Sequence, residues 1–352
     1  MDRTETTRRE FLRATSAAAA AAALGRIAPA ADAPKAPARP DPAKILNYNP
    51  KMGYRRLGKT DFWISEISLG GHGNGWKFLD HAAELGLNYV DNNIDGECER
   101  YGAAMAGMKS AKRDKWFIGF ASWPEKITPD GEKGLTVEGM LANIDKRLKG
   151  YRTDCLDLWR PVGATWGKGQ NNVETLLEVS DRALDLVVAT FEKARKQGKV
   201  RHLGVSAHNP KVFRKVLTKY PQFEVIIFPY LFLTEEMGGN SLLSLAKEKD
   251  VGVIGLKPFG AGSTFGVKKT QDQVFTDKRG PVMLKEMLKE PRLSAVIPGV
   301  GAREHLDENV KGSYERAVPH SAADRKALRQ CRRNFHAHLA PEYRWLRRWQ
   351  CV

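Results

Sequence analysis

The stretch VSDRALDLVVATFEKARKQGKVRHLGVS, residues 179–206, contains one complete helix-to-strand unit of this chain. Its apolar residues recur at the spacing of a helix and are Leu184, Val187, Val188, Phe191 and Ala194. Gly198 follows as a stop signal, and the short β-like run His202–Ser206 then predicts a strand. A long amphipathic helix followed by a short buried strand is the repeating unit of α/β folds.

Similar units recur along the chain. The predicted strands are Ile64–Leu69, Leu87–Asp91, Trp116–Phe120, Cys155–Trp159, His202–Ser206, Val225–Pro229, Val251–Leu256 and Ala295–Pro298. The predicted helices are 76–85, 98–112, 135–149, 180–197, 209–219, 240–249, 280–290 and 302–312. Several strands are apolar on both faces, as in a buried parallel sheet. Eight strand–helix units over roughly 250 residues predict an α/β fold of the (β/α)8 TIM-barrel type.

A doubly wound sheet is the alternative architecture. Such a sheet normally places a GxGxxG turn after its first strand. The sequence GGHGNG, residues 70–75, follows the first predicted strand, but position 76 is Trp. The fingerprint therefore fails, and the barrel is favoured.

The N-terminus predicts an export signal. The run TRREFLR, residues 7–13, precedes an alanine-rich segment, Ala14–Leu24, and a small-x-small cleavage site at Ala28–Ala30. Arg8 and Arg9 followed by Phe-Leu resemble a twin-arginine signal. We therefore expect a signal peptide over 1–30, a Pro/Ala-rich linker over 31–50 and a periplasmic protein. An alanine-rich helix is the structural alternative.

Composition limits the partners of the chain. It has 352 residues and a formal net charge of +16. Residues 324–352 contain eight Arg or Lys and two acidic residues, together with Tyr343, Trp345 and Trp349, and we expect a basic, aromatic helical extension over 319–352. Without a recognisable nucleic-acid motif, this charge favours a solvated basic surface or an anionic ligand over nucleic acid. Mean hydropathy is −0.45, so we expect no stable membrane insertion after cleavage. The four cysteines lack metal-ligand spacing, and we expect no metal.

Six motifs occur in one order along the chain: YRRLGKT (54–60), ISEISLGG (64–71), GLNYVD (86–91), GKVRHLGVS (198–206), GVIGLKPFGAG (252–262) and IPGVGAREHLDEN (297–309). Their order and spacing resemble the aldo-keto reductase family. The resemblance covers roughly residues 53–312 and implies a barrel over 51–318 with an N-terminal hairpin. It also implies carbonyl reduction with a nicotinamide cofactor.

The resemblance assigns a cofactor site for NADP(H). Small residues after a strand leave room for a pyrophosphate, and a guanidinium in the first turn of a helix suits the adenosine phosphate. Ser206 matches the residue that binds the nicotinamide amide. The other expected cofactor residues are Gly260, Gly262, Ser263, Gly299, Gly301, Arg303, His305, Glu308 and Asn309. The preference for NADP(H) over NAD(H) stays open.

The catalytic residues match the family pattern at one position. In the family a Tyr donates the proton, and a Lys lowers the pKa of that Tyr. An Asp holds the Lys, and a His orients the substrate. Asp91 matches the Asp, but Ala121 stands at the Lys position and the His position falls near Val162. The loop after Asp91 is about two residues shorter than in the family, and it has no Tyr at the acid position.

Other polar groups follow the predicted strands. The candidate catalytic set is Asp91, Asp95, Glu97, Arg160 and His208, and Lys257 ends the seventh strand. The active sites of such barrels lie at the face formed by the C-terminal ends of the strands. We therefore expect an NADP(H)-dependent oxidoreductase with altered catalytic residues and a small-molecule substrate, for which acidic compounds are candidates. A non-catalytic barrel that binds a nucleotide or anion is the alternative. The oligomeric state stays open.

Overall fold

The computed structural model describes residues 38–70, 73–92, 95–108, 113–122, 135–161, 180–235, 241–266 and 278–349. The expected signal peptide, the first part of the linker and Val162 lie outside these residues. The fold below concerns the compact unit that begins at Pro42.

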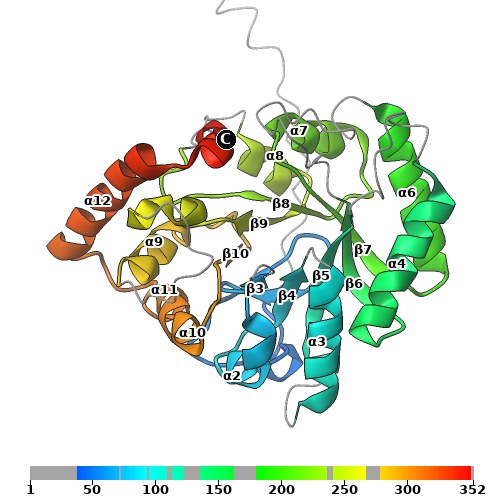
Figure 1. Cartoon of the computed structure of the whole chain (residues 1–352), viewed down its shortest axis with the longest axis horizontal. Coiled ribbons are helices and arrows are strands. Elements are labelled where there is room, and N and C mark those ends of the chain that lie inside the picture. Colours follow the sequence, from blue (N-terminus) through cyan, green and yellow to red (C-terminus); the bar gives the residue numbers. More distant parts are fainter. Residues whose placement is uncertain are drawn as a thin grey trace, which may run out of the picture. The chain divides into compact units, whose positions relative to one another are not determined.

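Eight parallel strands form one sheet in the order β10-β9-β8-β7-β6-β5-β4-β3 (Figure 1). Their bounds are β3 Leu69–Gly70, β4 Tyr89–Asn92, β5 Phe117–Ser122, β6 Leu156–Pro161, β7 Val200–Ser206, β8 Val225–Pro229, β9 Gly252–Leu256 and β10 Ala295–Ile297. A parallel bridge between Ile67 and Val296 brings the two edges together. The sequential order and this closure confirm the (β/α)8 barrel, whereas a doubly wound sheet would reverse its strand order.

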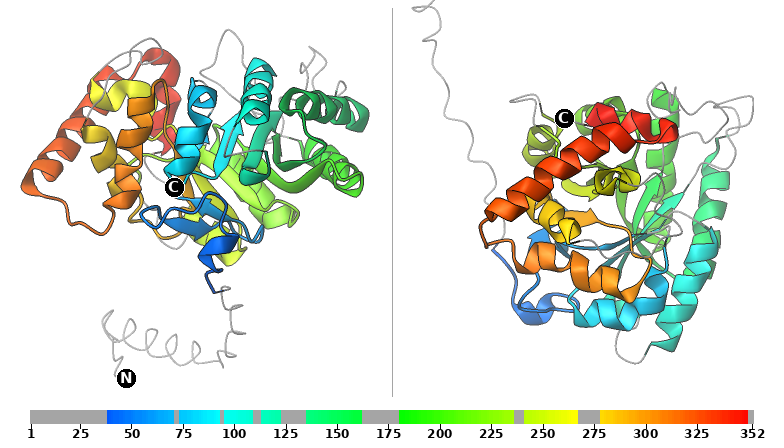
Figure 2. Two further views of the ribbon diagram at one scale, coloured as in Figure 1. Left: turned by 90° about the horizontal axis from the view of Figure 1, so that it is seen from below. Right: turned by 60° about the vertical axis from the view of Figure 1, so that its left-hand side comes forward.

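Helices surround the sheet (Figure 2). They are α2 Leu79–Glu84, α3 Asp95–Gly107, α4 Val137–Tyr151, α6 Asp181–Lys196, α7 Pro210–Lys219, α8 Leu242–Glu248, α9 Arg279–Met287, α10 Arg303–Asn309 and α11 Lys311–Tyr314. Helix α6 begins where the sequence predicts, because the Ser180 side chain caps it by accepting a hydrogen bond from Ala183 N. It ends before Gly198, whose φ of 73° favours glycine.

The first predicted strand, Ile64–Leu69, is wrong as one element. Its first half belongs to the antiparallel hairpin of β1 (Tyr54–Arg56) and β2 (Trp63–Ser65). The Ser65 side chain donates to Ile67 O at 2.7 Å, and Ser65 N donates to the Asn88 side chain at 2.8 Å. These local hydrogen bonds turn the chain between the hairpin and β3.

Side chains fill the barrel. Along β8, Val225 and Ile227 belong to one buried cluster, whereas Ile226 and Phe228 belong to a second. This alternation separates the interior of a barrel from the layer under its helices. The interior cluster includes Tyr89, Phe117 and Leu158. The centre of the barrel is therefore a packed core rather than a channel.

The C-terminal segment packs against the loop that follows β9. Helix α12, Ala322–His338, begins with a capping box of Ser321 and Asp324, and the 3-10 segment η7, Pro341–Trp349, follows it. Phe335 of α12 lies against Gly260, and the Asn334 side chain donates to Thr264 O at 3.0 Å. Figure 1 shows α12 beside α9. None of the described helices is long and apolar enough to cross a membrane.

Candidate functional site

Three buried polar residues meet at the C-terminal ends of β4, β6 and β7. Arg160 Nε donates to Asp91 Oδ1 at 2.9 Å, and Nη2 donates to Oδ2 at 2.8 Å. Arg160 Nη1 also donates to Ser206 Oγ at 2.6 Å. The relative exposure of these three residues is between 2% and 4%. The structure thus joins two predicted catalytic residues and one predicted cofactor residue in a single network.

The charges in this network compensate each other. Burial raises the pKa of the Asp91 carboxyl above its ordinary value, and Arg160 opposes that rise through its charge and its hydrogen bonds. A bidentate guanidinium–carboxylate pair is among the strongest charge-assisted contacts in proteins. Arg160 uses three of the five N–H donors of a guanidinium on Asp91 and Ser206. It therefore brings a fixed positive charge to the end of β6.

Small residues on β5 make room for this arrangement. In the sheet register Gly119 lies beside Asp91, and Ala121 lies beside Arg160. A Cβ at Gly119 would come within 2.2 Å of the Tyr89 hydroxyl and 3.3 Å of Asp91 Oδ1. The space that a larger residue on β5 would fill is thus occupied by Tyr89 from one side and by the ion pair from the other.

The first turns of α3 place Glu97 and Tyr101 beside β4. Glu97 is buried, and Tyr101 is buried with its hydroxyl near Gly70 O, at 3.5 Å. Burial raises the pKa of Tyr101 well above its ordinary range, and the negative charges of Glu97 and Asp91 raise it further. The Tyr101 phenol therefore keeps its proton at physiological pH. Asp95 begins the same helix, but its side chain lies outside the described part of the structure.

His208 follows β7 and belongs to a second group at the barrel mouth. Its ring stacks on Trp345 of η7, with ring centroids 3.7 Å apart. Burial and the nearby charge of Lys257 lower the pKa of His208 to about 3. The imidazole is therefore neutral at physiological pH. The sequence groups His208 with Asp91 and Arg160 as a candidate catalytic residue. In the structure its ring packs against Trp345 of the C-terminal segment.

The loop after β9 is tightly curled. Gly260, Ala261 and Gly262 all have positive φ, at 54°, 54° and 88°. Ser263 is buried, and its hydroxyl donates to Gly260 O at 2.6 Å. A Cβ at Gly260 would lie 2.8 Å from Phe335. Three of the expected cofactor residues, Gly260, Gly262 and Ser263, therefore lie in one loop that packs on α12. The Ser263 hydroxyl donates its hydrogen bond within that loop.

The loop after β10 is more open. Gly299 is exposed, and a Cβ there would meet no atom within 4 Å. His305 Nδ1 accepts a hydrogen bond from Gly301 N at 3.0 Å, and the Asn309 side chain donates to Gly299 O at 3.3 Å. These two contacts from α10 hold the loop in place. Glu308 lies on the same helix and is partly exposed.

Arg303 stands at the start of α10 with an exposed side chain. Its Nη2 lies 3.1 Å from His81 Nδ1, and His81 Nε2 lies 2.7 Å from Asp307 Oδ1. Within the described residues Arg303 forms no ion pair. Its guanidinium is thus positioned by the His81 ring, and its side chain is exposed to solvent.

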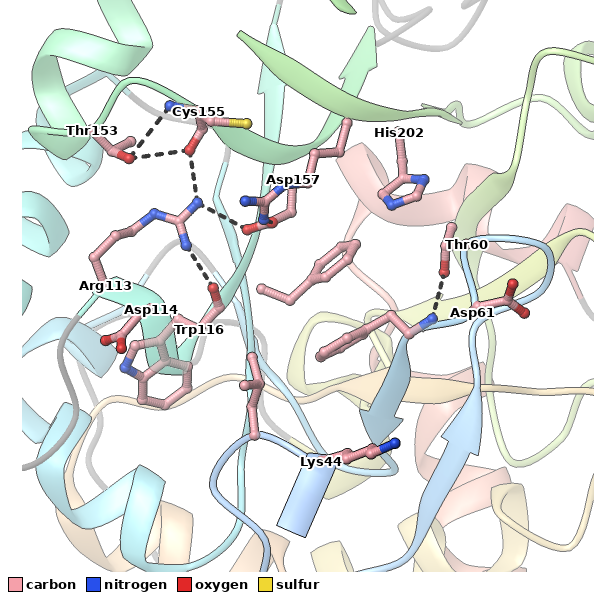
Figure 3. A pocket seen from close by; sticks show the side chains of 14 residues that line it. Lys44, Thr60, Asp61, Arg113, Asp114, Trp116, Thr153, Cys155, Asp157 and His202 are labelled. Carbon is pink, nitrogen blue, oxygen red and sulfur yellow. Dashed lines mark hydrogen bonds and ion pairs between the residues drawn. The ribbon is translucent and has the colours of Figure 1, made fainter. Parts of the chain in front are cut away.

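The opposite face of the barrel has a cavity of about 700 Å³ (Figure 3). It lies among the N-terminal ends of β5, β6 and β7, where Arg113 donates to Cys155 O and to Asp157 Oδ2. Asp157 also accepts hydrogen bonds from Ile118 N and from Arg201. Polar residues at the N-terminal face of a barrel generally serve stability. These charges bind one another, and the cavity is separate from the Asp91 network.

Two residues that the sequence did not single out as site residues lie close to this chemistry. Tyr89 packs inside the barrel, where its hydroxyl has no hydrogen-bond partner among the described residues, and the charge of Asp91 acts on it. Tyr343 of η7 lies against the ammonium of Lys257. The period-two pattern of β4 could have placed Tyr89 on the same face as Asp91, but no local pattern predicts the Tyr343 contact. Among the described residues no group of His, Cys, Asp and Glu could hold a metal ion.

Comparisons with known proteins agree with this architecture. The model of the aldo/keto reductase family matches residues 74–289. An uncharacterized oxidoreductase of Bacillus subtilis, YqkF, is 22% identical over 309 residues, which are 76% of this chain and 93% of that protein. The aldo-keto reductase str7 of Strobilurus tenacellus is 25% identical over 63% of this chain and 60% of its own length.

Solved structures share the fold. The holo form of the Bacillus halodurans aldo-keto reductase AKR11C1 has a TM-score of 0.58 and 19% identity, covering 80% of this chain and 96% of its own. The apo form of the same protein has a TM-score of 0.55 and 18% identity over the same shares.

Proposed function

The chain belongs to the aldo/keto reductase family of oxidoreductases, and from this premise we propose that it is an exported, NADP(H)-dependent enzyme with an altered catalytic centre. Its substrate is a carbonyl compound or the corresponding alcohol. The observation that carries the proposal is the buried network of Asp91, Arg160 and Ser206 at the face of the barrel where the family binds its cofactor.

In the proposed centre Arg160 replaces the lysine that the family places on the third barrel strand. Ala121 stands at that position, and Arg160 reaches Asp91 from the adjacent strand. A guanidinium keeps its charge at all physiological pH values, whereas a lysine can lose its proton. Arg160 therefore stabilises negative charge that develops near it, and it takes no part in proton transfer.

The residues that would hold the cofactor fit its nicotinamide end and its adenosine end. Ser206 accepts a hydrogen bond from Arg160 and keeps its own hydroxyl proton for the nicotinamide amide. Gly299 leaves its backbone open, and the exposed guanidinium of Arg303 suits the adenosine phosphate. When bound, the cofactor supplies the hydride. The loop at Gly260–Ser263 has a left-handed backbone, in which the N–H groups of Gly260 and Gly262 donate to Lys257 O and Phe259 O.

A proton must reach the carbonyl oxygen when a carbonyl is reduced. Tyr101 is a poor donor, because burial raises its pKa well above its ordinary value. We assign the donor role to Glu97, a buried carboxyl at the start of α3. Asp91 and Arg160 hold each other, and they orient Ser206 rather than exchange protons.

Cofactor binding tests the proposal directly. Calorimetry with NADPH and NADH should show a complex with the wild type. Arg303→Ala should lower the affinity for NADPH by about ten- to a hundred-fold, which corresponds to the loss of one charge-assisted hydrogen bond. Lys311→Ala changes another exposed cation, on α11, and serves as the control. If NADPH and NADH both fail to bind the wild type at millimolar concentration, the oxidoreductase function is wrong.

A panel of carbonyl substrates separates the enzyme from a binding protein. The enzyme should oxidise NADPH with at least one carbonyl compound. A non-catalytic barrel would bind the nucleotide and leave it unchanged with every compound. This alternative has some support, since the family tyrosine and lysine have no counterparts at their positions.

A further inference from the structure

Lys257 follows β9 directly, at the C-terminal end of that strand. Among the residues that the structure describes, its ammonium forms no ion pair or hydrogen bond with a side chain, and it lies 5.8 Å from the ring centre of Tyr343. The side chain is partly buried, and burial lowers the pKa of this lysine. A cation held away from water usually has an anion opposite it.

The backbone of Lys257 is also unusual. Its φ is 53°, in the left-handed region that residues other than glycine, asparagine and aspartate seldom adopt. Such strained positions cluster at ligand-binding and catalytic sites. The position lies at the C-terminal end of a barrel strand, the face where barrels build their sites. Two independent features, the charge and the backbone, thus single out the same residue.

One aromatic ring of the C-terminal segment lies against this cation, and two others contact its neighbour His208. Tyr343 lies against the ammonium, and Trp345 stacks on His208, which follows β7. The charge of Lys257 contributes to the lowered pKa of His208, so the two side chains are neighbours. Trp349 Nε1 donates to His208 O at 3.2 Å and fixes η7 to the end of β7. The group therefore combines one cation with several flat, neutral surfaces.

We propose that Lys257, Tyr343 and the stacked pair of His208 and Trp345 form a substrate subsite for an aromatic carboxylate. The ammonium of Lys257 pairs with the carboxylate, and the rings of Tyr343 and Trp345 contact the planar part of the substrate. This inference rests on the proposed function, because it assigns the charged end of the substrate to the mouth of the same barrel.

Binding of benzoate tests the subsite without any turnover. Calorimetry compares benzoate with benzyl alcohol, which has the same ring and no charge. The wild type should prefer benzoate, and Lys257→Met should lower the affinity for benzoate by about ten- to a hundred-fold. Lys257→Arg keeps the charge and should retain most of the preference. Lys311→Met removes an exposed lysine and should change nothing.

Turnover gives the second readout. The ratio of kcat/KM for 4-carboxybenzaldehyde to that for benzaldehyde should fall about ten- to a hundred-fold in Lys257→Met, mainly through KM. The Kd for NADPH should stay unchanged in the same variant. An equal loss for both aldehydes together with weaker NADPH binding would assign Lys257 to the cofactor diphosphate and overturn the subsite.

The two proposals can fail separately. If benzoate binding depends on Lys257 but the wild type binds neither NADPH nor NADH and reduces no carbonyl of the panel, the subsite stands and the oxidoreductase function fails. If both aldehydes are reduced with an unchanged ratio in Lys257→Met, the function stands and the subsite is wrong. Thermal unfolding of each variant ensures that the comparison is made between folded proteins.

Discussion

The guanidinium of Arg160 on β6 holds the carboxylate of Asp91 on β4 through two hydrogen bonds of 2.9 and 2.8 Å. The two strands are not neighbours, because β5 lies between them. The pair therefore ties three strands together at the C-terminal end of the barrel. Arg160 also donates a hydrogen bond to Ser206 Oγ, which extends the network to β7.

Breaking this pair should strongly destabilise the protein. Arg160→Met leaves a buried carboxylate without its partner, which should lower the free energy of unfolding by about 3–5 kcal/mol. Urea unfolding measures the effect. Lys193→Met removes an exposed partner of Glu138 and should cost less than about 1 kcal/mol. The double variant Arg160→Met/Asp91→Leu should recover part of the loss, and no loss in the single variant would contradict the buried pair.

His208 should make the protein acid-sensitive. Its folded-state pKa, about 3, lies below the ordinary value of 6.5. Between these values the unfolded chain binds more protons than the folded chain, so stability falls as pH falls below 6.5. The slope from one such group is at most about 1.4 kcal/mol per pH unit.

The variant His208→Phe isolates this contribution. It keeps an aromatic ring against Trp345 and removes the titrating group. Urea unfolding between pH 4 and pH 7 should give a shallower acid decline for the variant than for the wild type, since other groups still titrate in both. Parallel curves would show that His208 accepts a proton in the folded state.

Glu97→Gln should lower turnover by about 10²–10⁴, the usual contribution of a general acid. The amide keeps the size of the side chain but cannot act as a general acid. Glu99→Gln changes an exposed carboxyl on the same helix and should leave turnover unchanged. Wild-type rates in Glu97→Gln would remove Glu97 from the mechanism.

The C-terminal helix α12 should be part of the folded barrel. Phe335 is fully buried against Gly260, so Phe335→Ala should lower the free energy of unfolding by about 3–5 kcal/mol. It should also weaken NADPH binding, because Phe335 supports the curled loop at Gly260–Ser263. Val318→Ala, at a position that is 56% exposed, should change stability by less than about 0.5 kcal/mol. A small change in the free energy of unfolding in Phe335→Ala would show that α12 contributes little to the stability of the barrel.

Export should depend on the arginine pair near the N-terminus. Changing Arg8 and Arg9 to lysine keeps the charge and removes the two guanidinium groups, so the precursor should remain in the cytoplasm. Cell fractionation and the size of the protein report the outcome. Normal periplasmic accumulation of the double variant would exclude a twin-arginine signal.

The sequence by itself determined the barrel. Short apolar runs alternate with helical patterns along the chain, and α6 begins and ends at a cap and a stop that are local in sequence. Eight such units in order leave few other ways to bury so many apolar strands. The first strand was the exception, because the turn at Ser65 depends on Asn88, which is 23 residues away.

Only the tertiary structure decided how the site residues associate. Asp91, Arg160 and Ser206 are candidates one by one in the sequence, but their network depends on strand register and on the space left by Gly119. Likewise, Lys257 and Tyr343 are 86 positions apart, and the packing of η7 on the barrel mouth brings them together. Periodicity records which face of an element is buried. It does not record which side chains meet across that buried face, because those contacts depend on the shape and size of residues on other strands.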